Sequence, residues 1–100
     1  MTSDLAPFFS PDGVAIIGAS SNPRKLSHGI LKNMTLYGFQ GEIYPVNPKA
    51  DEILGLQSYL DIAEVPDPVD LAVIVLPAPM TPSVLRACGE RGIKAVIVIS

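Results

Sequence analysis

Cysteine and clustered basic residues are scarce in this sequence of 100 residues. Cys88 is the only cysteine, so an intrachain disulfide is excluded and a reducing compartment is compatible with the composition. Seven Lys and Arg residues stand against ten Asp and Glu, and the net charge of −3 argues against nucleic acid or an anionic membrane as a partner. No signal-like segment opens the chain, and its longest weakly polar run, residues 71–80, is too short to span a bilayer. These absences predict a cytoplasmic protein without a nucleic-acid or membrane partner.

Apolar residues, in contrast, make up 48% of the chain, which is enough for the core of a single domain over residues 1–100. Uninterrupted runs of β-forming residues alternate with stretches of helical periodicity, a pattern typical of a parallel sheet flanked by helices. We therefore predict an α/β fold with a parallel sheet of about five strands, at residues 14–17, 42–46, 57–59, 71–76 and 95–99. Helices are expected over residues 26–37 and 82–91, and one helical turn over residues 51–54.

The apolar residues of the two predicted helices recur at three- and four-residue steps, which indicates one buried face on each helix. These faces consist of Leu26, Ile30, Met34 and Tyr37 in the first helix and of Val84, Leu85 and Cys88 in the second. Thr81 followed by Pro82 predicts a capped start of the second helix, and Gly92 predicts its end.

The last predicted strand, residues 95–99, has the composition of a central strand, because it is an unbroken apolar run. One edge of the sheet is then left uncovered one residue before the sequence stops. We therefore expect the chain to be the N-terminal part of a larger protein, truncated after this strand, and to associate into an oligomer.

The most informative segment is the polar loop that follows the first predicted strand. In parallel α/β sheets such a loop lies at the carboxyl end of the strand, where ligands bind. Gly18 permits a tight turn, and the short side chains of Ala19 and Ser20 let backbone N–H groups approach an anion closely. The helix that follows directs a partial positive charge of roughly half a unit at the same place. The loop therefore predicts a site for a nucleotide diphosphate.

This loop departs from the dinucleotide fingerprint G-x-G-x-x-G, because only Gly18 of the three glycines is present. The acidic residue of that fingerprint is also missing, since the second strand ends in Val46-Asn47-Pro48-Lys49. A lysine at this position favours a ribose that carries a phosphate, which an ammonium attracts and a carboxylate repels. Coenzyme A with its 3′-phosphate and NADP with its 2′-phosphate both fit this requirement.

Four segments of the sequence extend this interpretation: FFSPDGVAIIGASSNP, GEIYPVNPKADEILGL, PVDLAVIVLPA and GIKAVIVIS. Together and in this order they resemble the coenzyme A-binding domain of the NDP-forming acyl-CoA synthetases. That group includes the ADP-forming acetate–CoA ligases and the alpha subunit of succinyl-CoA synthetase. The resemblance covers nearly the whole chain and implies a Rossmann-like domain that binds coenzyme A.

The resemblance also implies the reaction of the whole enzyme, acyl-CoA + ADP + phosphate ⇌ carboxylate + coenzyme A + ATP. In this family the phosphorylated histidine lies in a later domain. The ATP-grasp module, with its ATP or ADP and Mg, forms a further domain or a separate beta-type subunit. The resemblance therefore implies that this chain holds the cofactor and does not turn over alone.

Cofactor-binding residues follow from the matching motifs. The resemblance implies that residues 20–23 occupy the loop that holds the diphosphate, and that Lys49 meets the nucleotide end of coenzyme A. Val75 and Pro77 would line the site on the adenosine side. Ile99 and Ser100 match the start of the segment that receives the pantetheine arm. The full set is Gly18, Ala19, Ser20, Ser21, Asn22, Pro23, Val46, Asn47, Pro48, Lys49, Val75, Pro77, Ile99 and Ser100.

The other chemistry-bearing side chains are expected to be structural. His28 has no carboxylate three or four residues away to orient it, so we do not predict a catalytic role for it. Cys88 is expected to pack in the core, and Asp67 and Asp70 to be solvated carboxylates of a turn. No Cys, His, Asp or Glu cluster has the spacing of metal ligands. We therefore predict no catalytic residue and no metal site in this chain.

Two alternatives stay open beside the synthetase module. The first is a stand-alone or regulatory coenzyme A-binding module, for instance the sensor portion of a fused acetyltransferase. The second is an NADP-binding oxidoreductase domain, which the phosphate argument alone permits. The replacement of the later glycines by Ser20 to Pro23 disfavours this second alternative.

Overall fold

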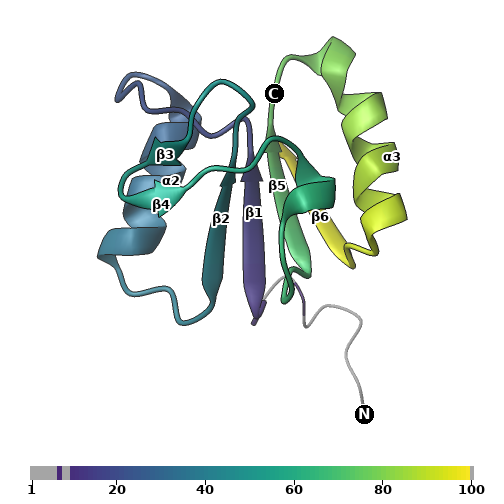
Figure 1. Ribbon diagram of the computed structural model, residues 1–100, viewed down its shortest axis with the longest axis horizontal. Helices are drawn as coiled ribbons and strands as arrows, with labels where there is room; N and C mark the ends of the chain where they lie inside the picture. The colour runs from purple at the N-terminus through teal and green to yellow at the C-terminus, as the bar shows by residue number, and fades with distance from the viewer. Residues whose placement is uncertain (1–6, 8–9, 100) are drawn as a thin grey trace.

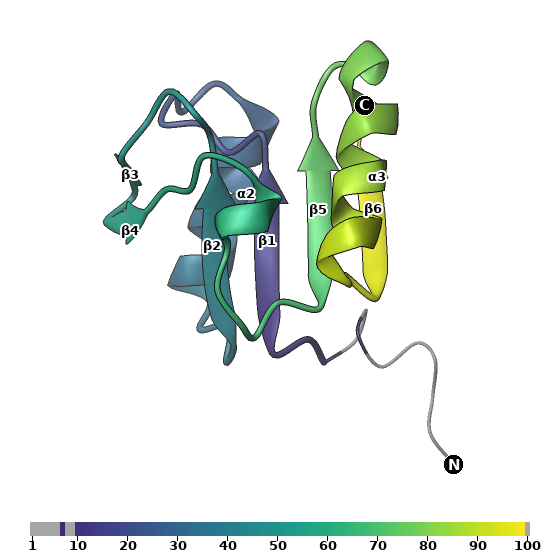
Figure 2. The same ribbon diagram turned by 45° about the vertical axis from the view of Figure 1, so that its right-hand side comes forward.

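The centre of the molecule is a four-stranded parallel sheet with a helix on each face (Figures 1 and 2). A computed structural model describes Pro7 and residues 10–99. The sheet order is β2-β1-β5-β6, with β1 (Gly13–Ile17), β2 (Glu42–Val46), β5 (Leu71–Val75) and β6 (Ala95–Ile99). The helices are α2 (Leu26–Leu36) and α3 (Thr81–Arg91). The predicted α/β, Rossmann-like class is confirmed, with four strands in the parallel sheet.

The remaining elements are short. Strands β3 (Glu52–Ile53) and β4 (Leu56–Gln57) form a separate antiparallel pair, and two 3-10 helices follow, η1 (Ile62–Glu64) and η2 (Ala78–Met80). η1 lies on the connection from β4 to β5, and η2 immediately precedes α3.

Successive residues of the central strands face opposite layers, as the two-residue period of a β-strand requires. Ala15 and Ile17 of β1 belong to the core cluster that includes Cys88 of α3. Val14 and Ile16 belong to the second cluster, which includes Leu31 of α2. All five residues of β1 are buried, which explains why this strand is an unbroken run of small and apolar residues.

The buried face of α2 is rotated from the predicted one. Leu31 is fully buried, and Ile30 and Met34 pack against the core as expected. Leu26 and Tyr37 are 58% and 84% exposed, so the prediction was wrong for both. The reason is their position, because Leu26 borders an open cleft at the first residue of the helix and Tyr37 follows the last helical residue.

The core-facing side of α3 is confirmed for Cys88, which is buried, and for Val84, which packs against the same cluster. Leu85 is 41% exposed, contrary to the prediction. Ala87 and not Leu85 contacts the core, because positions 84, 87 and 88 share one helix face at steps of three and four residues.

The start of α3 also differs from the prediction. Thr81 is the first helical residue and no side chain caps the helix, whose N-cap residue is Met80. The end of α3 is as predicted: Gly92 has a left-handed conformation with φ of 84°, and its N–H donates to the carbonyls of the last turn.

The predicted helical turn over residues 51–54 and the strand over residues 57–59 were wrong. Glu52–Ile53 instead pairs with Leu56–Gln57 in a hairpin whose two turn residues, Leu54 and Gly55, both have positive φ. Two-residue turns of this handedness match the twist of paired strands, and they allow the hairpin to close. Tyr59 forms only an isolated parallel bridge to Val46, so no fifth strand joins the sheet within the part of the chain that the structure describes.

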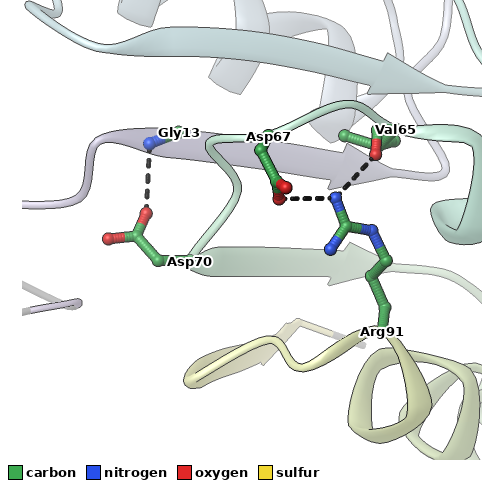
Figure 3. A network of polar contacts seen from close by, with 5 residues as sticks. All are labelled: Gly13, Val65, Asp67, Asp70 and Arg91. Atoms are coloured by element: carbon green, nitrogen blue, oxygen red, sulfur yellow. Dashed lines mark hydrogen bonds and ion pairs between the residues drawn. The ribbon is translucent and has the colours of Figure 1, made fainter.

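A polar network closes the amino end of the sheet (Figure 3). The carboxylate of Asp70 accepts hydrogen bonds from Gly13 N–H at 3.0 Å and from Asp12 N–H at 3.2 Å. The prediction of a solvated Asp70 was therefore wrong, because its carboxylate fixes the entry to β1. Arg91 Nη2 donates to the Val65 carbonyl at 2.9 Å and to the Asp67 carboxylate at 2.8 Å, while the Asp67 side chain stays 85% exposed.

Strand β6 forms one edge of the sheet, as predicted, and Ile97 and Val98 on it are 39% and 46% exposed. Among residues 10–99, no helix combines the length and the apolar character needed to cross a membrane.

The two leucines of α2 test this packing directly. Leu31 is fully buried, so we expect Leu31→Ala to lower the free energy of unfolding by about 2–5 kcal/mol through lost apolar burial and a residual cavity. Leu36 is 66% exposed on the same helix, and Leu36→Ala should change stability by no more than about 0.5 kcal/mol. Urea unfolding of both variants measures the difference, and equal losses would contradict the observed helix orientation.

Candidate functional site

A cleft of about 860 Å³ lies at the carboxyl ends of the sheet strands. Parallel strands end at the same edge of a sheet, so the loops that follow β1, β2 and β5 meet there (Figure 1). These three loops line the cleft together with residues 60–62 and with residues of α3. Segments distant in sequence therefore form one concave surface.

Most of the residues predicted to bind a cofactor line this cleft. These are Gly18, Ala19, Ser20, Val46, Asn47, Pro48, Lys49, Val75, Pro77 and Ile99. Ser21, Asn22 and Pro23 are exposed in the same loop but do not line the cleft. Ser100 lies outside the described residues.

Sequence reasoning missed three parts of the cleft wall and two residues at the ends of strands, Ile17 and Leu76. The three parts are the start of α2, the segment that leads into η1, and the residues of η2 and α3 that border the cleft. The missed lining residues are Ile17, Lys25, Leu26, Ser27, Leu60, Asp61, Ile62, Leu76, Met80, Val84 and Ala87. Lys25 stands next to the loop in sequence, which was an available signal, whereas nothing local places residues 60–62 beside it.

Gly18 fixes how the chain leaves β1. Its N–H donates to the Val46 carbonyl at 3.0 Å, and its φ is +94°, in the region that side chains disfavour. A Cβ at this position would collide with the carbonyl oxygen of Val75 and lie 3.0 Å from Leu76 Cδ2. Glycine is therefore required both by the backbone conformation and by the close approach to the end of β5.

The loop after Gly18 is held from both sides. Ala19 is buried in the α2-side cluster, and its carbonyl accepts a hydrogen bond from Asn47 Nδ2 at 2.8 Å. The next carbonyl, that of Ser20, is 2.9 Å from Nδ1 of the buried His28. The Ser20 and Asn22 side chains accept hydrogen bonds from N–H groups two residues later, so they close the loop on itself.

The turn after β2 carries Lys49 to the rim of the cleft. Asn47 Oδ1 accepts a hydrogen bond from Lys49 N–H at 2.8 Å, and Asn47 O accepts from Ala50 N–H at 3.3 Å. The Ser58 hydroxyl also donates to Asn47 O at 3.2 Å. Lys49 itself is exposed and lines the cleft, and among residues 10–99 it forms no ion pair.

The charges around the cleft favour an anionic ligand. Lys25 and Lys49 line it, and the start of α2, which no side chain caps, adds the partial positive charge of a helix N-terminus. Asp61 is the carboxylate among the lining residues, and its Oδ1 accepts a hydrogen bond from Ala63 N–H at 2.9 Å. In the described part of the chain, no group of three or more His, Cys, Asp or Glu side chains is placed to hold a metal ion.

Comparison with known proteins identifies what this arrangement is similar to. The sequence matches the CoA binding domain family over residues 12–100. It is 47% identical to the alpha subunit of acetate–CoA ligase [ADP-forming] I of Pyrococcus furiosus, with 96% of this chain covered. The chain spans only 22% of that relative's length.

Solved structures show the same similarity. The apo form of Ca. Korarchaeum cryptofilum dinucleotide forming acetyl-coenzyme A synthetase 1 matches with a TM-score of 0.93 and 44% identity over 96% of this chain, which spans 21% of that protein. A shorter protein is also similar: a conserved hypothetical protein from Pyrococcus furiosus matches with a TM-score of 0.81 and 39% identity. There the match covers 87% of this chain and 73% of the other.

Alanine substitutions at two glycines with positive φ separate the cost of backbone strain from the cost of a steric clash. At Gly38 nothing lies within 4 Å of an added Cβ, so Gly38→Ala should cost only the strain of its φ of +72°, about 1–2 kcal/mol of stability. Gly18→Ala adds the collision with Val75 O and should cost about 1–3 kcal/mol more. Chemical denaturation of both variants measures this. Equal losses would show that Gly18 does not approach β5 as described.

Cys88 is expected to behave as a core residue. Burial raises the pKa of its thiol, which lowers the fraction of reactive thiolate. We expect a thiol reagent at pH 8 to modify the folded protein at least tenfold more slowly than the urea-unfolded protein, as an order-of-magnitude estimate. Similar rates in the two states would mean that Cys88 is accessible.

Proposed function

This chain belongs to the CoA binding domain family, and we propose that it binds coenzyme A in the cleft at the carboxyl ends of β1, β2 and β5. The observation that carries the proposal is that the loop 18–20 and Lys49, which come from different strands, line the same cleft. The cleft lining therefore combines a loop with free backbone N–H groups and a cation. This pairing suits a ligand that carries a diphosphate and a separate phosphate.

The chemistry of the loop supports the placement of the diphosphate. Within residues 10–99, the N–H groups of Ser20 and Ser21 have no protein acceptor. Free N–H groups in a loop at the start of a helix form a favourable site for phosphate oxygens. Lys25 at the start of α2 adds a positive charge beside them.

The rest of the cleft supports the placement of the nucleotide and the pantetheine arm. Val75 and Pro77 follow β5, and Met80 and Val84 continue the wall along η2 and α3. These apolar side chains offer a surface for an adenine ring, and Ile99 extends it toward the end of β6. We assign Lys49 to the 3′-phosphate of the ribose, because it is an exposed lysine that lines the same cleft.

We further propose that the chain is the coenzyme A-binding module of an ADP-forming acyl-CoA synthetase. The similarity to an ADP-forming acetate–CoA ligase over most of this chain supports this. Because the chain spans about a fifth of that relative, we assign the phosphorylated histidine to other domains. We assign the ATP-grasp module with its ATP or ADP and Mg to a further domain or a beta-type subunit. The exposed edge strand β6 supports association with further protein, and the single buried cysteine supports a cytoplasmic setting.

A stand-alone coenzyme A-binding protein is the second candidate. The shorter Pyrococcus furiosus protein favours it, because this chain covers 73% of that protein's length. The length of the complete reading frame separates the candidates. A reading frame that continues into a domain with the phosphorylated histidine supports the synthetase. A reading frame of similar length to this chain supports the stand-alone protein.

Thermal unfolding with three ligands tests the site. Coenzyme A at about 100 times its Kd should stabilise the protein by about 2.7 kcal/mol and raise Tm by roughly 10 °C or more. The 3′-dephospho form should raise Tm much less, and NADP should have little effect. A response to NADP and none to coenzyme A would contradict the proposal and favour an oxidoreductase domain.

A pair of lysine variants assigns the 3′-phosphate. Lys49→Gln should weaken coenzyme A binding about tenfold, because it removes a charge-assisted contact, and should leave the affinity for 3′-dephospho-coenzyme A nearly unchanged. Lys94→Gln is the matched control, since Lys94 is exposed just before β6 at the opposite end of the sheet. Calorimetric titration of the wild type and of both variants with each ligand measures these affinities. If Lys49→Gln weakens both ligands equally, Lys49 does not contact the 3′-phosphate.

A further inference from the structure

We infer that Asn47 and His28 are positioning residues, which orient two consecutive peptide planes of the loop after β1 so that their N–H groups face the diphosphate. This inference rests on the proposed function and assigns to Asn47 a role other than direct contact with the ligand. It assigns to His28, which the sequence analysis treated as structural only, a role in preparing the binding loop.

Two side-chain donors hold consecutive carbonyls of the loop. Asn47 Nδ2 donates to the Ala19 carbonyl at 2.8 Å, from the turn after β2. His28 Nδ1 lies 2.9 Å from the Ser20 carbonyl, on the first turn of α2. A carbonyl oxygen can only accept, so Nδ1 of His28 carries the hydrogen. Both contacts are at least partly buried, which shields them from competing water.

The orientation of the N–H groups follows from peptide geometry. In a planar trans peptide, the carbonyl of one residue and the N–H of the next point in opposite directions. Holding the Ala19 carbonyl toward Asn47 therefore turns Ser20 N–H away from Asn47. Holding the Ser20 carbonyl toward His28 likewise turns Ser21 N–H away from His28. Neither N–H has an acceptor within residues 10–99. Ser20 lines the cleft, and Ser21 is exposed next to it in the chain.

This arrangement matters because a peptide plane can flip. A flipped plane would present a carbonyl oxygen to the phosphate, which would repel it, where the observed plane presents a donor. Asn47 and His28 fix the donor orientation before the ligand arrives, and such preorganisation lowers the ordering cost of binding. Asn47 also accepts a hydrogen bond from Lys49 N–H through Oδ1, so one side chain links the diphosphate loop to the turn that carries Lys49.

Four variants test the inference. His28→Phe keeps a ring but removes the donor, and Asn47→Ala removes both of the side-chain contacts of Asn47. We expect each to weaken coenzyme A binding about tenfold in calorimetric titration. His28→Asn should restore most of the affinity, because the amide nitrogen of Asn can occupy the place of Nδ1. Asn33→Ala is the matched control for Asn47, since Asn33 is exposed on α2, and it should bind as the wild type does.

Amide resonances separate positioning from a general loss of structure. In the wild type, coenzyme A should shift the amide protons of Ser20 and Ser21 downfield, as donation to phosphate oxygen requires. In His28→Phe the Ser21 shift should be lost, and in Asn47→Ala the Ser20 shift, while the dispersion of the remaining spectrum reports that the protein is folded. Variants that bind as the wild type does, or a wild type whose Ser20 and Ser21 amides do not respond to bound coenzyme A, would overturn the inference.

Inorganic pyrophosphate, titrated in parallel, separates a failure of the positioning role from a failure of the proposed function. If coenzyme A binds without moving the Ser20 and Ser21 amides, the proposed function stands and the positioning role is wrong. If coenzyme A does not bind but pyrophosphate shifts these amides in the wild type and not in the variants, the positioning role stands and the proposed function is wrong. If neither ligand shifts them, the positioning role is wrong.

Discussion

The ligand-binding edge of this domain depends on the way in which the chain leaves its central strand at Gly18. β1 has a parallel neighbour on each side, so its exit must pass between the ends of β2 and β5. Gly18 meets both neighbours, through a hydrogen bond to the Val46 carbonyl and through contact with the Val75 carbonyl. The absence of a side chain permits this passage and keeps the ends of β2 and β5 close to the loop that follows β1. A larger residue would separate them, and the shared cleft would open.

The residues that line the cleft favour an anionic ligand although the protein as a whole is acidic. The net charge of −3 comes from carboxylates spread over the chain, whereas Lys25, Lys49 and the start of α2 border one cavity. At physiological ionic strength charges farther than about 8 Å are largely screened, so the local set decides which ligand is favoured. Composition disfavours nucleic acid as a partner, because a polyanion needs an extended basic surface. A small ligand with phosphates at two points needs only what this cleft offers.

The sequence predicted correctly the strands and helices that local residue patterns determine. The predictions were wrong where contacts with distant parts of the chain determine the structure. Runs such as 14–17 and 71–75 were identified as strands because they are short and rich in β-branched residues, and because the lack of polar residues is typical of a strand covered on both faces. Residues 51–54 were expected to be helical, but the positive φ of Leu54 and Gly55 closes a hairpin that Ile53 anchors in the core. Asp70 was expected to be solvated, because its acceptance of N–H groups from the start of β1 is a contact across 57 residues.

The same distinction explains which parts of the site could be predicted. Loops that follow parallel strands are brought together by the topology alone, so the residues after β1, β2 and β5 could be identified from sequence. The contacts of His28 and Asn47 could not be predicted from the sequence. Each side chain donates to a backbone carbonyl, and since every residue has one, the residue type does not identify the acceptor. These two hydrogen bonds also account for the absence of the second and third glycines of the G-x-G-x-x-G fingerprint. A glycine-rich loop reaches phosphate through freedom of its backbone, and that freedom is lost on binding. Here Ala19 is buried and two carbonyls are already held, so a loop with side chains can present its N–H groups at a smaller entropic cost.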